Sequence, residues 1–296
     1  MRTITRSNDS TLIPDGARDD ARRRTKIVAT LGPATDDASV IEQLILAGTD
    51  VFRVNFSHGT PADQQARVAR VLDVAQKVGR HIGIMGDLQG PKIRVESFKA
   101  GSVVLVEGHE FILDVAMDPH AGDEHAVGCA YRNLTTDVAA GDTLLLDDGL
   151  IVLEVEEVEG TRIHCIVKQG GRLADHKGLN KQGGGLSAPA LTDKDRRDIE
   201  TAARLKLDFM SVSFARSAED IEEARRLLRA AGGQGRIVAK IERAEAVTNI
   251  RAIIDASDVI MVARGDLAVE VGYALMRGLE KGLIRFARAR NKLCIT

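Results

Sequence analysis

The chain has 296 residues, and its 41 Lys and Arg residues nearly balance 43 Asp and Glu residues, leaving a formal charge of −2. Its hydrophobic content of 44% is typical of globular proteins and excludes a disordered chain. The near-neutral balance and the 3% aromatic content argue against nucleic acid as a partner. No apolar run approaches the ~18 residues that predict a membrane span. Three scattered cysteines favour reduced thiols and a cytoplasmic setting.

After a polar tail over residues 1–24, which lacks the apolar core of a secretory signal, short apolar runs alternate with amphipathic stretches. The runs are rich in Val and Ile without strict alternation, which predicts parallel strands buried on both faces. They begin at Thr25, Asp50, His81, Leu207, Arg236, Asp258 and Lys292. Helical spacing over residues 62–78 and from Ile221, with capping signals at Thr192 and Ser217, predicts helices between them. Repeated strand–helix units predict a parallel sheet, either open and doubly wound or closed as a barrel.

The alternation stops between about Val95 and Gly183. Short runs with a period of two and tight-turn signals at Asp148-Gly149 and Glu159-Gly160 predict an antiparallel β module inserted into the α/β domain. The stretch where this module returns to the α/β domain, residues 168–181, is basic. The expected domains are therefore an α/β domain at 25–94 and 184–296 and a β domain at 95–183.

The strand predicted from Arg236 carries Lys240 and Glu242, which are two residues apart and so point to the same face. An ordinary ion pair explains them, and so does a metal-binding carboxylate beside a cation that neutralises a transferring phosphoryl group. Asp266 follows the next strand in a Gly-Asp pair that is also common in turns. Together the two strand ends supply two carboxylates, a plausible site for a hard cation that water and substrate oxygens complete.

Arg53, Asn55 and Ser57 alternate with apolar residues and share one face of another predicted strand. A strand at a surface edge explains them, but the apolar flanks look fully buried, and buried Arg and Asn need partners. Arg53 would suit a phosphate, and Asn55 or Ser57 a cation or a hydroxyl.

Asp87, Lys92 and Arg94 surround a Gly-Pro turn directly before the β module. This turn is either a plain hinge or a second phosphate-contacting cluster beneath a movable lid.

Several longer segments resemble pyruvate kinase, in the family's order, from about Thr25 to the end of the chain. They read KIVATLGPAT, FRVNFSHG, GDLQGPKIR, GLNKQGGGLSAPALT, SVSFAR, IVAKIE and VARGDLAVE. The amino-acid sequence of these segments is most similar to that of the bacterial type. The resemblance implies a (β/α)8 TIM barrel with an inserted antiparallel β-barrel lid, and phosphoryl transfer from phosphoenolpyruvate to ADP, giving pyruvate and ATP in the last step of glycolysis.

The resemblance also implies roles around the transferred phosphoryl group. Lys240 and Arg53 would be catalytic, with Arg53 on the phosphoryl group and the nucleotide, and Lys240 on the charge that passes through the phosphoryl group and the enolate. The backbone around Arg264, Gly265 and Asp266 would receive the substrate carboxylate.

The cation and nucleotide sites follow from the same resemblance. Mg²⁺ or Mn²⁺ would be held by Glu242 and Asp266. Nucleotide contacts would come from Arg53, Asn55, Arg94 and Lys177. A monovalent cation such as K⁺ would be held by Asn55, Ser57 and Asp87.

Lys92 departs from the family, because potassium-dependent relatives resemble one another in having Glu there. A fixed ammonium at this position could replace the monovalent cation, so K⁺ is predicted not to be required. Leu88 also stands where many relatives have Thr, which puts one cation contact in doubt.

The chain stops at KLCIT, where the family continues into A-T-Q-M and a C-terminal domain. Without its tail and insert it falls short of the ~250 residues typical of a complete barrel. We therefore expect a barrel truncated in its seventh strand, a chain inactive by itself, and the family's homotetramer only for the full-length protein. The alternatives are a non-catalytic truncated paralogue acting as a binding or regulatory partner, and a Mg²⁺-dependent lyase of related barrel type.

Overall fold

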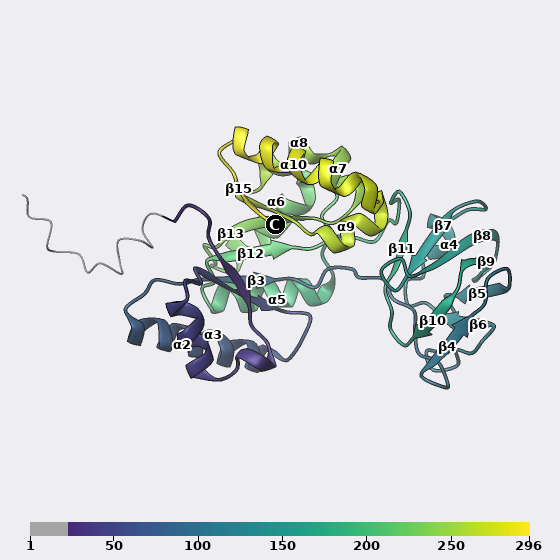
Figure 1. The fold of residues 1–296 in the computed structure, drawn as a ribbon, viewed down its shortest axis with the longest axis horizontal. Helices are drawn as coiled ribbons and strands as arrows, with labels where there is room; N and C mark the ends of the chain where they lie inside the picture. Colours follow the sequence, from purple (N-terminus) through teal and green to yellow (C-terminus); the bar gives the residue numbers. More distant parts are fainter. Residues whose placement is uncertain (1–22) are drawn as a thin grey trace, which may run out of the picture. The chain divides into compact units, whose positions relative to one another are not determined.

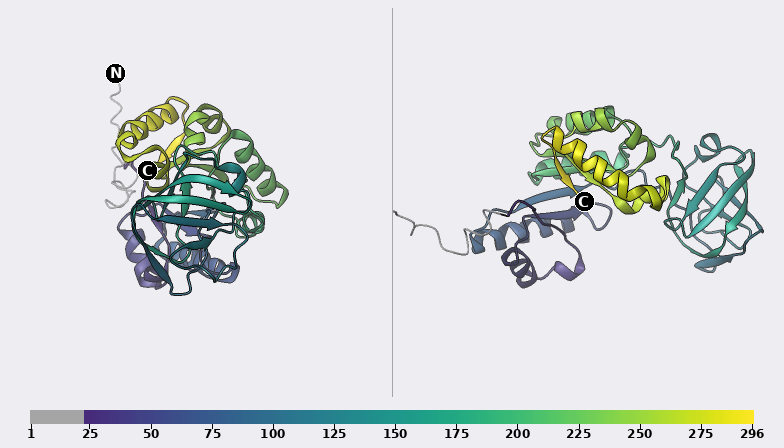
Figure 2. Two further views of the ribbon diagram at one scale, coloured as in Figure 1. Left: turned by 90° about the vertical axis from the view of Figure 1, so that its right-hand side faces the viewer. Right: turned by 45° about the horizontal axis from the view of Figure 1, so that its top comes forward.

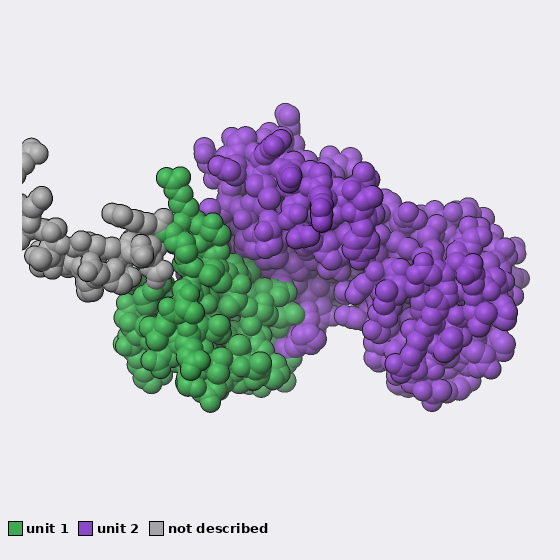
Figure 3. Space-filling view, in the orientation of Figure 1, with its two compact units in different colours: residues 1–55, 59–85 green, residues 56–58, 86–296 purple. Residues whose placement is uncertain are grey.

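The computed structural model describes residues 23–296, so the predicted polar tail lies almost wholly outside the described residues. Figure 3 colours two compact units along the chain. The first contains the described residues up to Asn55 together with Gly59–Met85, and the second contains Phe56–His58 together with Gly86–Thr296. These units differ from the predicted domains, whose boundaries stay a prediction.

The first unit begins the strand–helix alternation (Figure 1). Its elements are β1 (Val28–Thr30), the short 3₁₀ helix η1 (Pro33–Thr35), α2 (Ala38–Leu46), β2 (Val51–Asn55), α3 (Pro61–Val78) and the start of β3 (Gly83–Asp87). Strand β1 pairs with β2 in parallel, and the Gly83 amide donates to the Asp50 carbonyl (2.9 Å), which brings β3 beside β2. Helix α3 begins at a capping box made by Thr60 and Asp63, and it buries Val68, Val71 and Val74.

The second unit continues the same pattern with parallel strands β12, β13, β14 and β15, in that order, and six helices. The strands are β12 (Phe209–Val212), β13 (Arg236–Ile241), β14 (Val259–Val262) and β15 (Leu293–Ile295). The helices are α5 (Asp193–Arg204), α6 (Ala218–Ala230), α7 (Ala244–Thr248), α8 (Ile250–Ala256), α9 (Arg264–Val271) and α10 (Tyr273–Ala289). Strand β3 neighbours β12 at its carboxyl end, where the amide of Leu88, the residue after β3, donates to the Ser211 carbonyl (3.1 Å).

The apolar runs form strands because both faces of the sheet are covered. Helix α6 packs on β13, and α10 packs on β14 and β15 (Figure 2). Ile237, Val238 and Ala239 are consecutive on β13 and all fully buried, so neither face of that strand reaches water. This architecture confirms the predicted α/β class with parallel strands.

The insert forms a β module with its own apolar core. Its elements are β4 (Ser102–Leu105), β5 (Glu110–Asp114), β6 (Ala126–Gly128), α4 (Leu134–Asp137), β7 (Thr143–Leu146), β8 (Ile151–Glu159), β9 (Arg162–Gln169), β10 (Gly171–Ala174) and β11 (Leu179–Lys181). Both predicted tight turns lie between antiparallel neighbours, β7–β8 and β8–β9. The prediction of a purely antiparallel module was wrong in one place, because β5 and β6 pair in parallel. The long connection between those two strands allows the chain to cross over before it pairs.

The cysteines are all free thiols, as predicted. Burial raises the pKa of Cys129 to about 11 and that of Cys165 to about 12, so both behave as apolar core residues of the insert. None of the helices in residues 23–296 combines the length and the apolar character that crossing a bilayer requires.

Candidate active site

Lys240 lies one residue before the end of β13, and its ammonium is enclosed by polar groups from neighbouring strand ends. The side chain is buried, with Nζ 2.8 Å from Glu242 Oε1, 2.9 Å from Ser213 Oγ and 3.4 Å from Asp87 Oδ1. These partners follow or end β13, β12 and β3, so the carboxyl ends of three parallel strands meet here. A charge can be buried in this way only where such partners compensate it.

Two serines complete the surroundings of the ammonium. Ser211 Oγ donates to Asp87 Oδ1 (2.6 Å), and Ser213 Oγ donates to the Leu88 carbonyl (2.7 Å). Because the Ser213 proton is used in this bond, its oxygen is free to accept from Lys240. The hydroxyls therefore fix the position of both charged groups.

Glu242 is fully enclosed directly after β13, and its Oε2 accepts from the Phe214 amide (2.8 Å). Burial raises the pKa of Glu242, and the Asp266 carboxylate raises it further against the opposing effect of Lys240. Asp266 is the third residue of α9, and its Oδ1 lies 3.2 Å from Lys92 Nζ. Two carboxylates from neighbouring strand ends, one of them fully buried, form a site that favours an added cation.

The start of α9 offers backbone donors beside these carboxylates. The helix begins at Arg264, with Ala263 alone between it and the end of β14, so the amides of its first turn have no acceptor within the helix. The Arg264 side chain extends away to Glu280 (3.6 Å) and is mostly exposed. The backbone at Arg264, Gly265 and Asp266 is thus suited to bind an anion.

Arg94 and Lys177 lie at the two connections of the β module. An Arg94 guanidinium nitrogen donates to the His176 carbonyl (2.7 Å), and Lys177 Nζ lies 2.8 Å from Asp147 Oδ1. A neighbouring cavity of about 340 Å³ is lined by residues that include Lys92, Arg94, Tyr131 and His176. The structure thereby brings Lys92 and Arg94 to one cavity.

Arg53 and Asn55 belong to the first unit, on the half-buried face of β2, whereas Phe52 and Val54 face the core. Arg53 donates to Thr30 Oγ1 (3.1 Å), and the Asn55 carbonyl accepts from Gln64 (3.2 Å). Ser57 belongs to the second unit and is half-buried in the turn after β2.

Sequence reasoning missed Ser211, Ser213, Arg243 and Glu270, all of which are buried around this site. The two serines had a signal, because they alternate within an otherwise apolar run. No sequence pattern marked Arg243 or Glu270, apart from their proximity in the chain to Glu242 and Asp266.

A comparison with protein families identifies the family to which the chain belongs. The family model described as "Pyruvate kinase, barrel domain" matches residues 22–296. The chain belongs to the pyruvate kinase barrel-domain family. The resemblance stated from the sequence motifs is thereby confirmed.

Relatives of known name agree with this assignment. Pyruvate kinase II of Salmonella typhimurium is 53% identical over 93% of this chain, and the pyruvate kinase of Haemophilus influenzae is 52% identical over the same share. A crystal structure of a pyruvate kinase from Cryptosporidium parvum matches with a TM-score of 0.88 at 30% identity, covering 94% of this chain and 58% of that one. The chain spans 58% of the length of both bacterial relatives.

Proposed function

We propose that this chain carries the phosphoryl-transfer site of a pyruvate kinase, which moves the phosphoryl group of phosphoenolpyruvate to ADP and yields pyruvate and ATP. The observation that supports this proposal is the enclosed Lys240 ammonium, held by Asp87, Ser213 and Glu242 at the carboxyl ends of the parallel strands. Active sites of α/β barrels lie at this end of the strands.

The proposed mechanism rests on positioning and charge. Phosphoryl transfer needs little covalent help from the protein, so neutralising the charge on the transferring group lowers most of the barrier. Lys240 would face that charge and then the enolate oxygen, and Arg53 would bind the phosphoryl group and the nucleotide. The first amides of α9, at Arg264, Gly265 and Asp266, would orient the substrate carboxylate.

Glu242 and Asp266 fit a magnesium or manganese ion. Such ions typically take one or two protein carboxylates and complete their coordination with water and phosphate oxygens. Among residues 23–296, no three His, Cys, Asp or Glu side chains gather as a metal site. The ion would supply positive charge to the transferring phosphoryl group. Lys240 and Lys92 would offset part of the negative charge of the two carboxylates.

The nucleotide and the monovalent cation complete the proposed site. Arg94, Lys177, Arg53 and Asn55 would contact the nucleotide. Asn55, Ser57 and Asp87 would be the monovalent-cation ligands, with K⁺ not required because of Lys92.

The proposed architecture is that of the family: a (β/α)8 barrel from residues 25–94 and 184–296, with residues 95–183 as a β-barrel lid. Closure of the lid would exclude water, which competes with ADP for the phosphoryl group. We further propose a cytoplasmic protein whose full-length form is a homotetramer, with no nucleic acid or membrane as partner.

Calorimetric titration tests the proposal through binding. The chain should bind phosphoenolpyruvate and ADP only when Mg²⁺ is present. Glu242→Gln should abolish this Mg²⁺-dependent binding. A chain that binds neither ligand contradicts the proposal. Metal-independent nucleotide binding that Glu242→Gln leaves unchanged would instead favour a non-catalytic paralogue.

A further inference from the structure

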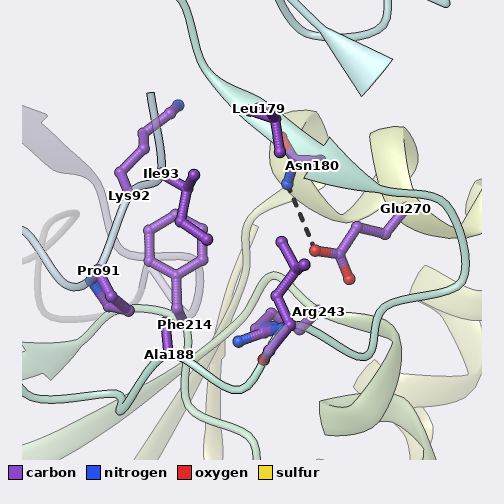
Figure 4. A pocket seen from close by; sticks show the side chains of 10 residues that line it. Pro91, Lys92, Ile93, Leu179, Asn180, Ala188, Phe214, Arg243 and Glu270 are labelled. Atoms are coloured by element: carbon purple, nitrogen blue, oxygen red, sulfur yellow. Dashed lines mark hydrogen bonds between the residues drawn. The ribbon is translucent and has the colours of Figure 1, made fainter. Parts of the chain in front are cut away.

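Glu270 lies one helical turn after Asp266 on α9, and its carboxylate is almost completely buried. Each oxygen accepts from a different segment of the chain. Oε2 accepts from the Ala244 amide (2.9 Å), two residues after Glu242, and Oε1 accepts from Asn180 Nδ2 (3.3 Å) on β11 of the insert (Figure 4). One side chain therefore connects the helix of Asp266, the turn after Glu242 and the end of the insert.

The end of the insert, residues 180–186, which we call the lid-return segment, is held at three further points. The Gly183 amide donates to the Glu270 carbonyl (3.1 Å), and the Gly185 amide donates to Glu245 Oε1 (2.6 Å). The buried guanidinium of Arg243 donates to the Leu186 carbonyl (2.8 Å). The segment is thus fixed to residues that lie within one helical turn after Glu242 and Asp266 in the chain.

The fit at this joint leaves little freedom. Gly184 has φ +82°, which favours glycine, and a Cβ there would lie 2.7 Å from Glu245 Oε2, so a larger residue would displace the carboxylate that binds Gly185. The cavity between Asn180, Arg243 and Glu270 measures about 20 Å³, which is room for about one water molecule. The contact is therefore a structural joint and not a ligand pocket.

We propose that Glu270 is a positioning residue that holds the lid-return segment and the two carboxylates, Glu242 and Asp266, in one fixed geometry. This inference rests on the proposed function, because it assigns the joint to a site for Mg²⁺ and phosphoryl transfer. Movement of the insert would then be transmitted to the metal-binding carboxylates through this joint, with the Glu270 side chain as the contact that reaches Asn180 and Ala244 together.

The length of the side chain, and not its charge, is the property that this role requires. Gln at position 270 keeps the length, and it can accept from Ala244 while donating to an Asn180 amide that has rotated by half a turn. Asp is one methylene shorter, so it cannot reach both partners. Glu270→Gln should therefore rescue what Glu270→Asp loses.

Hydrogen exchange followed by mass spectrometry tests the joint. Glu270→Asp and Asn180→Ala should speed exchange in residues 179–186 about tenfold, while peptides from β12–β14 keep their wild-type rates. Glu270→Gln should match the wild type, as should Glu157→Asp, a control at an exposed position on β8. Unchanged exchange in Glu270→Asp overturns the proposal, as does faster exchange spread over β12–β14, which indicates a purely structural role.

Titration with Mn²⁺, read by electron paramagnetic resonance, tests the carboxylates. Glu270→Asp should weaken Mn²⁺ binding about tenfold, and Glu270→Gln and Glu157→Asp should not change it. Equal Mn²⁺ affinity in Glu270→Asp and the wild type overturns the positioning role. If the wild-type chain binds no Mn²⁺, the proposed function fails, and the exchange rates alone then decide whether the joint exists.

Discussion

At the scale of single residues, the Lys240 ammonium and the Glu242 carboxylate are buried and hold one another in place. Their contact of 2.8 Å, the Ser213 hydroxyl on Lys240 and the Phe214 amide on Glu242 replace the water that both groups lose on folding. Such a pair adds little net stability by itself, but removing one member leaves the other charged and uncompensated. The stability of the fold and the chemistry of the site are therefore linked at this pair.

Replacing Lys240 tests this link. Lys240→Met should lower the free energy of unfolding by about 3–5 kcal/mol, because Glu242 then remains buried beside Asp266 without its cation. Adding Glu242→Gln should recover part of the loss, since an amide needs no counter-charge. Urea denaturation measures both variants, with Lys281→Met at an exposed position on α10 as the control. Equal unfolding free energies in Lys240→Met and the control would contradict this account.

Lys92 gives a second prediction at this scale. Its ammonium lies 3.2 Å from Asp266 and provides a fixed positive charge at the site, so added K⁺ should change phosphoenolpyruvate affinity by less than about twofold. Lys92→Glu reverses that charge and should make binding depend on K⁺. The measurement is titration in buffer free of Na⁺ and K⁺, with Lys99→Met as a control. A many-fold response of the wild type to K⁺ would show the prediction to be wrong.

At the scale of elements, α5 and α6 begin where local signals place them, and an ion pair then fixes α6 on the sheet. Thr192 and Ser217 make the predicted capping boxes of α5 and α6. Helix α6 is tied to the sheet through Arg225, which donates to Asp258 Oδ2 (2.8 Å) and to the Ala256 carbonyl (2.6 Å). The Asp258 carboxylate also accepts from the amide of Ile237, the second residue of β13.

The Asp258 contacts predict a pH dependence. Burial alone would raise the pKa of Asp258, but its bonds with Arg225 and Ile237 outweigh burial and hold that pKa below its usual value. The stabilisation is therefore complete above the unfolded-state pKa of about 3.9 and is lost as the pH falls through the lower folded-state value.

Asp258→Asn should cost about 1 kcal/mol of unfolding free energy at neutral pH. The difference in unfolding free energy between the variant and the wild type should narrow as the medium is acidified below about pH 4. Denaturant unfolding across this range measures the difference. Asp148→Asn, in an exposed turn, is the matched control. A difference that grows on acidification would contradict the assigned sign.

At the scale of the whole molecule, the chain passes from one compact unit to the other within β3. Asp87, which ends that strand, belongs to the second unit, and Arg53 and Asn55 belong to the first. The curated relatives extend well beyond the part that this chain matches.

A coupled assay for pyruvate gives the prediction at this scale. Residues 1–296 by themselves should give little or no turnover with phosphoenolpyruvate, ADP and Mg²⁺, because this chain spans 58% of the relatives' length. A full-length relative assayed in parallel is the positive control. Turnover close to that control would overturn the expectation and make the matched region sufficient for catalysis.

The sequence by itself determined the parallel strands, the starts of α5 and α6 and the family, because buried runs, caps and motifs depend on residues close together in the chain. It also predicted that Lys240 and Glu242 share a face. Only the tertiary structure placed Ser213 and Asp87 on Lys240, and Asn180 on Glu270, since these contacts join residues 27, 153 and 90 positions apart. No local pattern specifies such pairs. They form because parallel strands bring their carboxyl ends together and because a buried charge needs partners, wherever in the chain those partners lie.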